Sequence, residues 1–445
     1  MKKLLMISLL CILNVSVYAN DFLTIYNQNQ AMFKTSVELD LKRGTQYISF
    51  ENIPTTIITE SVTFLPRNRN VQLFSQNFEY DLANTQKMMQ RYLNKFVRLT
   101  TDTEQFFGTL VFFDYGNYGL LNATTNELNI VNTSKVNSVQ LSEMPTDFYS
   151  KPTLRWQLNA DRDGKYVADL TYLMSGIEWR ATYNVVLGKN DFTFNSWVTI
   201  NNRSGKDYKN VNLKLIAGDV ATHQQQWARN GAMGMDMMMS RNAEPAPSFE
   251  EREFSDLRIY TLDQLADIDD FQEKQLSLYP IKTVQYTRKY QYRVLGRDVD
   301  VLIAFKNSTQ NGLGVALPRG NVNFYEIDEK DNTQQFVGVA RLNNTSLNQD
   351  IELRIGSAFD IIAETKTLSS QTTGRTRESE YEVTLINNKS ESVEVEVQRF
   401  VGGSNFEILN PSVPFERKDA FTFVFKVQIP AGKTEKITFL ERMNM

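Results

Sequence analysis

The chain has 445 residues, of which 22% are charged and 41% hydrophobic, and its formal net charge is −4. This balance, without a clustered basic face, argues against a nucleic-acid-binding protein. The single cysteine and the single histidine exclude a disulfide framework and a zinc centre built from several histidines. Length alone predicts about three domains.

The first residues have the pattern of a secretory signal. Lys2 and Lys3 are basic, Leu4 to Leu13 form an apolar run, and Val17-Tyr18-Ala19 presents small residues to a signal peptidase. The sequence therefore predicts a signal peptide over residues 1–19, with cleavage after Ala19, and a periplasmic or secreted mature protein. The apolar run is too short to span a bilayer and no later stretch is long enough, so no transmembrane segment is expected after the signal is removed.

Removal of this signal would change the chemistry of the chain. Cys11, the only cysteine, would be lost, which leaves no thiol for catalysis, metal binding or a disulfide. Two lysines would leave with it, so the net charge would move from −4 to −6.

The mature chain alternates apolar and polar residues in one short run after another. Val37–Pro54 alternates around Gly44, and Thr153–Leu173 alternates around Asp163-Gly164. Both stretches are typical of β-hairpins, because Gly and Asp-Gly tolerate the backbone of a tight turn. Asp161-Arg162-Asp163-Gly164 also resembles part of a calcium loop, but no glutamate follows at the required spacing, so we interpret it as a turn.

Further alternating runs follow at short, regular spacing. They are Asp191–Asn202, Val211–Val220, Asp298–Asn307, Asn321–Asp328, Gln349–Gly356, Glu380–Asn388, Glu391–Phe400, Phe421–Pro430 and Thr434–Met443. This spacing predicts an all-β protein of antiparallel β-sandwich domains, without the repeated β-helix-β units of a nucleotide-binding fold. We expect an N-terminal β domain over 20–85, an insert over 86–145, a central β-sandwich over 146–375, and C-terminal strands over 376–445 that complete a sandwich.

The insert differs from its surroundings. Met88, Tyr92 and Phe96 are spaced as one face of a helix, with Met89 and Leu93 beside it. Four or five short strands follow, a pattern that suggests a small closed barrel of the Sm or SH3 type. Basic residues in the insert are few and scattered, so we favour a protein-contact or structural role over RNA binding.

The longest irregular stretch, 223–253, is predicted to be a disordered loop rich in methionine. His223, Met233, Met235, Met237 and Met239 are the candidate metal ligands of the sequence, since thioethers prefer Cu(I). Clustered methionines also form adaptable surfaces for proteins or lipids, and we favour this interpretation. No cofactor is predicted.

Most of the chain from Lys151 onward resembles the bacterial family called domain of unknown function 4139. The matching stretches are Pro152–Trp156, Tyr172–Tyr183, Trp197–Asn202, Ser204-Gly205, Leu213–Val220, Leu317–Gly320, Leu353–Gly356, Ala358–Asp360 and Val427–Phe439. Met174 and Ser175 stand where that family tends to have threonine and glycine. The resemblance implies an exported, β-rich bacterial protein, and it supplies no catalytic residues. Within the central stretch, Trp179, Ala181 and Tyr183 alternate onto one strand face, which predicts a sandwich core.

The acidic residues offer little evidence of catalysis. Asp267, Asp269 and Asp270 are interpreted as turn caps, and the run Glu250, Glu251 and Glu253 as a solvated charged segment. We therefore predict no catalytic residues and favour a protein that is not an enzyme, although the sequence leaves this open.

The sequence favours an exported envelope protein that acts as a non-enzymatic scaffold or protein-interaction module, with another envelope protein as its partner. One alternative is a periplasmic Cu(I)-binding protein that uses the methionine-rich loop. A second is a hydrolase of envelope glycans or peptides. The sequence does not indicate an oligomeric state.

Overall fold

The structure, a computed structural model, describes residues 21–444 except 69, 82–83, 115, 143–147, 219–247 and 402–405. Strands hold 67% of the residues and helices 4%, which confirms the prediction of an all-β protein. The predicted signal peptide lies outside the described residues, as does most of the methionine-rich segment. Among the described helices, none is long and apolar enough to cross a membrane.

The chain forms two compact units, each built from separated segments. The first unit comprises the described parts of Met1–Trp179 with Ile200–Ile216 and Gln264–Lys274, and the second comprises the described parts of the remainder. The predicted linear division into an N-terminal, a central and a C-terminal domain does not match this arrangement. Strands from the N-terminal stretch pair with strands from residues 153–217, because pairing partners in a sheet need not be neighbours in sequence.

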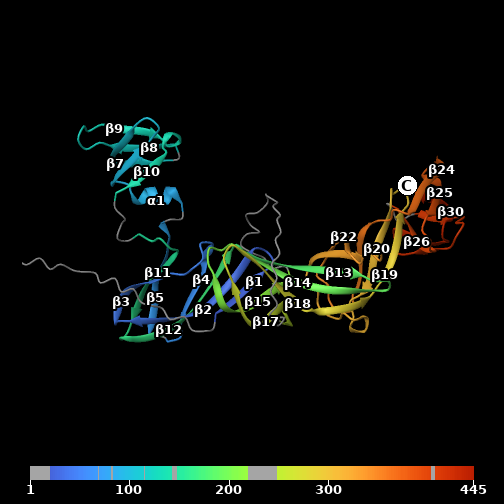
Figure 1. The fold of residues 1–445 in the computed structure, drawn as a ribbon, viewed down its shortest axis with the longest axis horizontal. Helices are drawn as coiled ribbons and strands as arrows, with labels where there is room; N and C mark the ends of the chain where they lie inside the picture. Colours follow the sequence, from blue (N-terminus) through green and yellow to red (C-terminus); the bar gives the residue numbers. More distant parts are fainter. Residues whose placement is uncertain are drawn as a thin grey trace, which may run out of the picture. The chain divides into compact units, whose positions relative to one another are not determined.

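The first unit contains two main sheets (Figure 1). The larger has the order β16-β17-β15-β1-β2-β12-β4, in which β16 is Phe249–Phe254, β1 is parallel to β15, and the pairs β1–β2, β2–β12 and β12–β4 are antiparallel. Its other strands are β17 (Leu257–Ile268), β15 (Tyr208–Ala217), β1 (Phe22–Tyr26), β2 (Gln30–Leu41), β12 (Gly164–Ser175) and β4 (Ile57–Pro66). The smaller is antiparallel and has the order β3-β11-β5, from β3 (Gly44–Phe50), β11 (Thr153–Ala160) and β5 (Val71–Glu79).

The two stretches of this unit that were predicted to be hairpins do not pair as hairpins. The turns stand where they were expected, and Gly44 has a φ of 98°. However, β2 and β3 belong to different sheets, and so do β11 and β12. Alternation shows only that one face of each strand is buried. It does not tell whether two successive strands pair within one sheet or lie in two sheets that face each other across the core. The two turns contact each other, since the Arg43 amide donates to the Asp163 carboxylate at 2.7 Å.

The core of the first unit contains a buried lysine. Lys206 precedes β15, is 8% exposed, and donates from Nζ to the Tyr172 hydroxyl at 3.4 Å. Its ammonium lies 4.4 Å from the ring centroid of Phe33 and 5.1 Å from that of Tyr208. Burial lowers the pKa of Lys206 to about 8, and the nearby Asp21 carboxylate opposes that shift. The π faces and this carboxylate compensate part of the cost of burying an ammonium.

The insert is a separate five-stranded antiparallel sheet of order β10-β6-β7-β8-β9, preceded by a short helix. Its elements are α1 (Thr85–Arg91), β6 (Phe96–Thr100), β7 (Gln105–Phe113), β8 (Asn117–Leu121), β9 (Leu128–Asn132) and β10 (Ser138–Leu141). The last strand lies beside the first, as in a small barrel, but β9 and β10 do not pair with each other, so the sheet is not closed as the prediction had it. Met89 and Tyr92 join the insert core as predicted, and Asn84 caps the helix by accepting from the Lys87 amide.

One residue of the predicted helical face was assigned wrongly. Phe96 is the first residue of β6 rather than part of the helix, and it is exposed. The helix ends at Arg91, and Asn94 follows with a φ of 63°, a backbone conformation that does not continue a helix.

The second unit contains three sheets. The first has the order β18-β14-β13-β21-β22, with β13 parallel to β21. Its strands are β18 (Gln272–Gln285), β14 (Asp191–Asn202), β13 (Ile177–Leu187), β21 (Gly320–Ile327) and β22 (Gln334–Leu342). Strand β16 (Phe249–Phe254) pairs with the start of β17. The predicted loop over 223–253 therefore extends too far, because its last residues form a strand.

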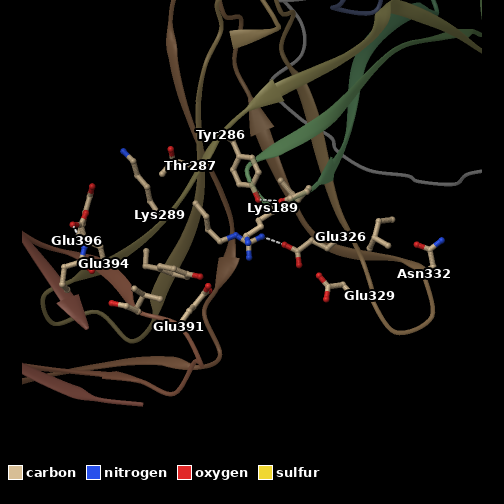
Figure 2. Close-up of a pocket in the computed structure, with 18 residues that line it drawn as sticks. Lys189, Tyr286, Thr287, Lys289, Glu326, Glu329, Asn332, Glu391, Glu394 and Glu396 are labelled. Atoms are coloured by element: carbon tan, nitrogen blue, oxygen red, sulfur yellow. Dashed lines mark hydrogen bonds and ion pairs between the residues drawn. The ribbon is translucent and has the colours of Figure 1, made fainter. Parts of the chain in front are cut away.

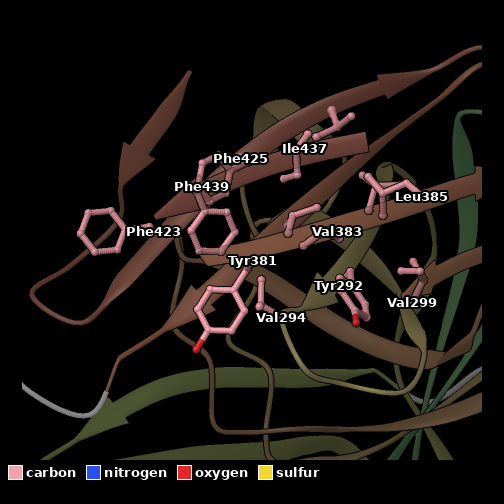
Figure 3. Packing of buried hydrophobic residues seen from close by; sticks show 14 of the residues in the cluster. Tyr292, Val294, Val299, Tyr381, Val383, Leu385, Phe423, Phe425, Ile437 and Phe439 are labelled. Atoms are coloured by element: carbon pink, nitrogen blue, oxygen red, sulfur yellow. The ribbon is translucent and has the colours of Figure 1, made fainter. Parts of the chain in front are cut away.

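The other two sheets face each other as a C-terminal sandwich. The first has the order β23-β20-β19-β26-β29-β28, from β23 (Asp350–Ser357), β20 (Val299–Lys306), β19 (Thr287–Arg293), β26 (Val393–Phe400), β29 (Thr422–Ile429) and β28 (Phe415–Arg417). The second has the order β24-β25-β30-β27, from β24 (Ile361–Thr373), β25 (Thr376–Asn387), β30 (Thr434–Asn444) and β27 (Phe406–Leu409). Figure 3 shows the aromatic and aliphatic side chains between them, among them Tyr292, Val383 and Phe425. The domain boundary predicted at 375/376 falls in the β24–β25 turn, inside one sheet.

The predicted core residues of β13 are confirmed. Trp179, Ala181 and Tyr183 are all buried. The Trp179 indole donates to the Ile216 carbonyl at 3.2 Å, and the Tyr183 hydroxyl donates to the Pro318 carbonyl at 2.6 Å. Each large ring thus adds burial and also satisfies its polar atom within the core.

Lys206 should make the stability of the protein depend on pH. Between pH 8 and 10.5 the unfolded chain holds the lysine proton and the folded chain releases it, so unfolding takes up a proton and the free energy of unfolding rises with pH. At about 1.4 kcal/mol per pKa unit, the gain from pH 8 to 9.5 is about 1.5 kcal/mol. Urea unfolding at several pH values measures it.

The matched variant is Lys206→Met, which keeps the volume and removes the charge. Asp21, Tyr172 and Tyr208 also face the ammonium, and burial raises the pKa of both tyrosines, so the comparison stays below pH 10. The rise should disappear in the variant. An equal rise in both proteins would show that another group causes it.

Candidate functional site

The outer face of the insert sheet carries large apolar side chains. Phe96, Phe107, Leu128 and Ile130 are 47%, 49%, 50% and 62% exposed. The opposite face of the same sheet contributes the buried insert core, including Val97, Leu99, Leu110, Leu120 and Val131. We call the outward set of Phe96, Phe107, Phe112, Leu121, Leu128 and Ile130 the apolar face.

Strand register brings the members of the apolar face together. Leu128 of β9 pairs with Leu121 of β8, which pairs with Thr109 of β7, which pairs with Phe96 of β6. These four residues therefore form one row across the sheet. The Phe96 and Phe107 rings are 6.4 Å apart between centroids, which extends the row along the strands.

A second row runs from Ile130 through Gly119 to Phe112. A Cβ atom on Gly119 would lie 2.2 Å from the Phe112 ring, so the ring lies directly over the glycine. The aromatic ring covers bare backbone in the middle of the sheet and fills the gap between the two ends of the apolar face. The result is a continuous apolar surface across three strands.

Charge is sparse on this side of the sheet. Among the outward strand positions that the structure describes, Arg98 is the charged one, and it bonds to Gln140 at 3.4 Å. An aromatic-rich patch with few charges has the composition of the centre of a protein interface. By contrast, Phe359 is 94% exposed but stands in the turn between β23 and β24.

The second unit contains an open charged cleft of about 1130 Å³ (Figure 2). Glutamates dominate its lining, namely Glu326, Glu329, Glu391, Glu394 and Glu396. Its volume exceeds that of a usual small-molecule pocket, and its walls are mainly polar.

Two of the cations that line the cleft are held in ion pairs. Arg288 forms an ion pair with Glu326, and Lys289 donates to Glu352 at 2.6 Å. Burial opposes the charge of Arg288, yet the bond to Glu326 outweighs it and raises the arginine pKa. The bond to Glu352 likewise raises the pKa of Lys289. Both cations therefore stay charged, and the cleft wall is a network of ion pairs rather than a set of displaced acids and bases.

The predicted metal ligands cannot be placed. His223, Met233, Met235, Met237 and Met239 lie outside the described residues. Within the part of the chain that the structure describes, no group of three or more histidine, cysteine, aspartate or glutamate side chains could hold a metal ion.

The predicted solvated run around Glu251 is partly wrong. Glu251 is largely buried, and its carboxylate accepts from the Tyr279 hydroxyl at 3.0 Å and the Ala316 amide at 3.2 Å. Arg258 donates to the same carboxylate at 3.3 Å. Burial, with Tyr260 and Glu251 close by, raises the pKa of Tyr279, which therefore keeps its proton and donates. The alternation of β16 turns Glu251 inward, whereas Glu250 is exposed.

The aspartates predicted to cap the turn after Ile268 bond instead to the segment before and at the start of β15. Asp267 accepts from the Asn210 amide at 2.8 Å, and Asp270 accepts from the Gly205 amide at 3.0 Å. Asp269 forms an ion pair with Lys209. Asp267 and Asp270 thus fix the backbone of residues 205–210, between β14 and the start of β15. Asp163 also lies in a turn, as interpreted from the sequence, and its carboxylate accepts a hydrogen bond from the Arg43 amide.

Comparisons with known proteins assign no relative. No protein-family model matches the chain, and no curated protein is significantly similar to it. The resemblance to domain of unknown function 4139 therefore stays a prediction.

Glu251 should contribute to stability. Glu251→Gln keeps the shape but removes the charge that strengthens three hydrogen bonds, and we expect the free energy of unfolding to fall by about 1–2 kcal/mol. Glu250→Gln, on the exposed face of the same strand, should change it by less than about 0.5 kcal/mol. Urea unfolding measures both. Equal stability of the two variants would contradict the anchoring role.

Proposed function

We propose that the protein is an exported envelope protein that acts as a non-enzymatic scaffold and binds another envelope protein through the apolar face of its insert. The observation that carries the proposal is the sheet with two apolar faces. One face forms the insert core, and the other presents Phe96, Phe107, Leu128 and Ile130 about half exposed.

The energetics favour a partner on that face. Covering apolar surface stabilises a complex by about 25 cal/mol per Å², and aromatic side chains provide the largest such area with little loss of rotamer freedom. A surface of this kind left in water would instead promote non-specific association. A partner with a complementary apolar surface is therefore the simplest reason for this composition.

The other surfaces give weaker support to the rival functions. The candidate ligands of the Cu(I) hypothesis lie outside the described residues, so no contact of theirs supports it. In the charged cleft, Glu326 is engaged by Arg288 and Glu394 accepts from Gln428 at 2.9 Å. Carboxylates held in this way stabilise the wall of the cleft, whereas a hydrolase would need a pair free to exchange protons.

Removing the two phenylalanines should abolish partner binding. The double variant Phe96→Ser/Phe107→Ser should recover at least tenfold less of its partner from a cross-linked envelope extract, because two aromatic contacts near the centre of an interface are lost. Quantitative mass spectrometry of the co-purified proteins measures the loss. Circular dichroism checks that the variant remains folded.

The matched control is Phe359→Ser, which removes an exposed phenylalanine from a turn in the second unit. It should retain the same partner in the same amount as the unaltered chain. Equal recovery by the double variant and this control would refute the role of the apolar face.

A further inference from the structure

Strand β9 lies at the edge of the insert sheet and has no protecting charge. Its sequence is Leu-Asn-Ile-Val-Asn, and it pairs with β8 on one side only. Natural edge strands usually carry charges, prolines or bulges that prevent pairing with another chain. Several edges of the larger sheets do so, since β16 reads Phe-Glu-Glu-Arg-Glu-Phe and β23 contains Asp350, Glu352 and Arg354, whereas β3 and β10 are edge strands without charge.

The hydrogen bonds beside β9 identify which of its backbone groups face the open edge. Beyond the two ends of the β8–β9 ladder, the Asn122 amide donates to the Glu127 carbonyl at 2.9 Å and the Thr133 amide donates to the Gly116 carbonyl at 2.9 Å. In an antiparallel ladder, opposite residues alternate between pairs that exchange backbone hydrogen bonds and pairs that do not. Asn129 and Val131 therefore bond toward β8, and the amides and carbonyls of Leu128, Ile130 and Asn132 point away from it.

We propose that two copies of this chain associate by antiparallel pairing of β9 with β9, around a two-fold axis at Ile130. In this register Ile130 lies opposite Ile130 of the second copy, and Leu128 lies opposite Asn132. The three outward residues of each strand then form hydrogen-bonded pairs, which gives six backbone hydrogen bonds in a sheet of ten strands. A two-fold interface is closed, so the association stops at a dimer.

Charge at the ends of β9 favours this orientation. Glu127 immediately precedes the strand, and Lys135 lies in the 3-10 turn (Thr133–Lys135) that follows it. Both side chains are exposed. Antiparallel pairing brings Glu127 of one copy toward Lys135 of the other at both ends of the seam. Parallel pairing in register would place like charges beside each other, which is unfavourable.

The side chains of β9 agree with the same register. Ile130 and Leu128 are the most exposed members of the apolar face, and both project from the outer side of the edge strand. Pairing places the two Ile130 side chains next to each other, so each covers part of the other. The apolar faces of both copies then lie on one side of the joined sheet.

This inference goes beyond the proposed function, because it concerns the edge of the sheet and a second copy of the chain. The phenylalanines that test partner binding lie on β6 and β7, away from the edge. The Phe96→Ser/Phe107→Ser variant should therefore lose the partner and keep the dimer. The two proposals can fail separately.

Cross-linking through a single thiol tests the register. In a Cys11→Ala background, Ile130→Cys should be joined rapidly by a short bis-maleimide, because the two side chains start from backbones about 5.5 Å apart. Phe107→Cys is the control. It lies two strands inside the edge, so its two copies would be separated by about five strand spacings, on the order of 24 Å. A short reagent should give at least tenfold less covalent dimer for this control.

Removing the central donor tests the hydrogen bonds. Ile130→Pro deletes an amide that points away from β8, so the insert should keep its own fold while the dimer is lost. Light scattering after gel filtration should give twice the chain mass for the unaltered protein and the single chain mass for the variant. Circular dichroism of both proteins verifies folding.

Three outcomes would overturn the proposal. The first is an unaltered protein that is monomeric up to about 100 μM, including one that instead captures a different protein at β9. The second is a dimer that Ile130→Pro leaves intact, which would place the interface elsewhere. The third is a ladder of species larger than a dimer, which would indicate pairing of β9 with another edge, such as β10, and an open assembly.

Discussion

The structure depends on pairing the backbone polar groups at the ends and edges of its strands. A protein made almost wholly of strands has many such groups, and each one left unpaired in the interior costs free energy. Three asparagines provide the pairing at strand ends in the core. Asn202, Asn307 and Asn387 are fully buried, and each side-chain amide donates to two or more backbone carbonyls from separate segments. Asparagine suits this position because its short side chain carries both a double donor and an acceptor. Each one ties the end of a strand to the turn beyond it and to a further segment, which is a strand for Asn202 and Asn387 and the connection before β23 for Asn307.

The same requirement distinguishes the two units from the insert. In the main sheets most edges carry charge, with β3 as an exception, and ion pairs join strands within and between sheets. Arg399, for example, forms a largely buried pair with Glu441 at 2.5 Å across the C-terminal sandwich. The insert has neither device at β9, although its core is as well buried as the others. Its stability comes from one apolar face and a capped helix, and its other apolar face and the β9 edge are not covered by any residue that the structure describes.

Side-chain alternation predicted the strands well because burial on one face is a local property of the sequence. Asp191–Asn202 was predicted residue for residue, and the strand near Phe421–Pro430 to within one residue at each end. Alternation does not name a partner strand, which is why the stretches around Gly44 and Asp163 were taken for hairpins when their strands belong to facing sheets. The mistaken exposure of Glu251 has another origin, because the run of charge was taken as solvated throughout although one of its members turns inward. The parallel pairs β1–β15, β13–β21 and β19–β26 join segments far apart in the chain, and no local pattern specifies them.

The sequence did contain a sign of the apolar face, but it is a departure from alternation rather than an alternating pattern. Phe106–Phe113 is apolar at nearly every position, whereas the strands of the two units alternate. A strand that is apolar on both sides is typical of one covered on both sides. In a five-stranded sheet with a single core, one of those sides has nothing from the described chain to cover it. This uncovered apolar side is the reason for proposing a partner on the insert, and the β9 edge beside it is the reason for proposing a second copy that extends the sheet.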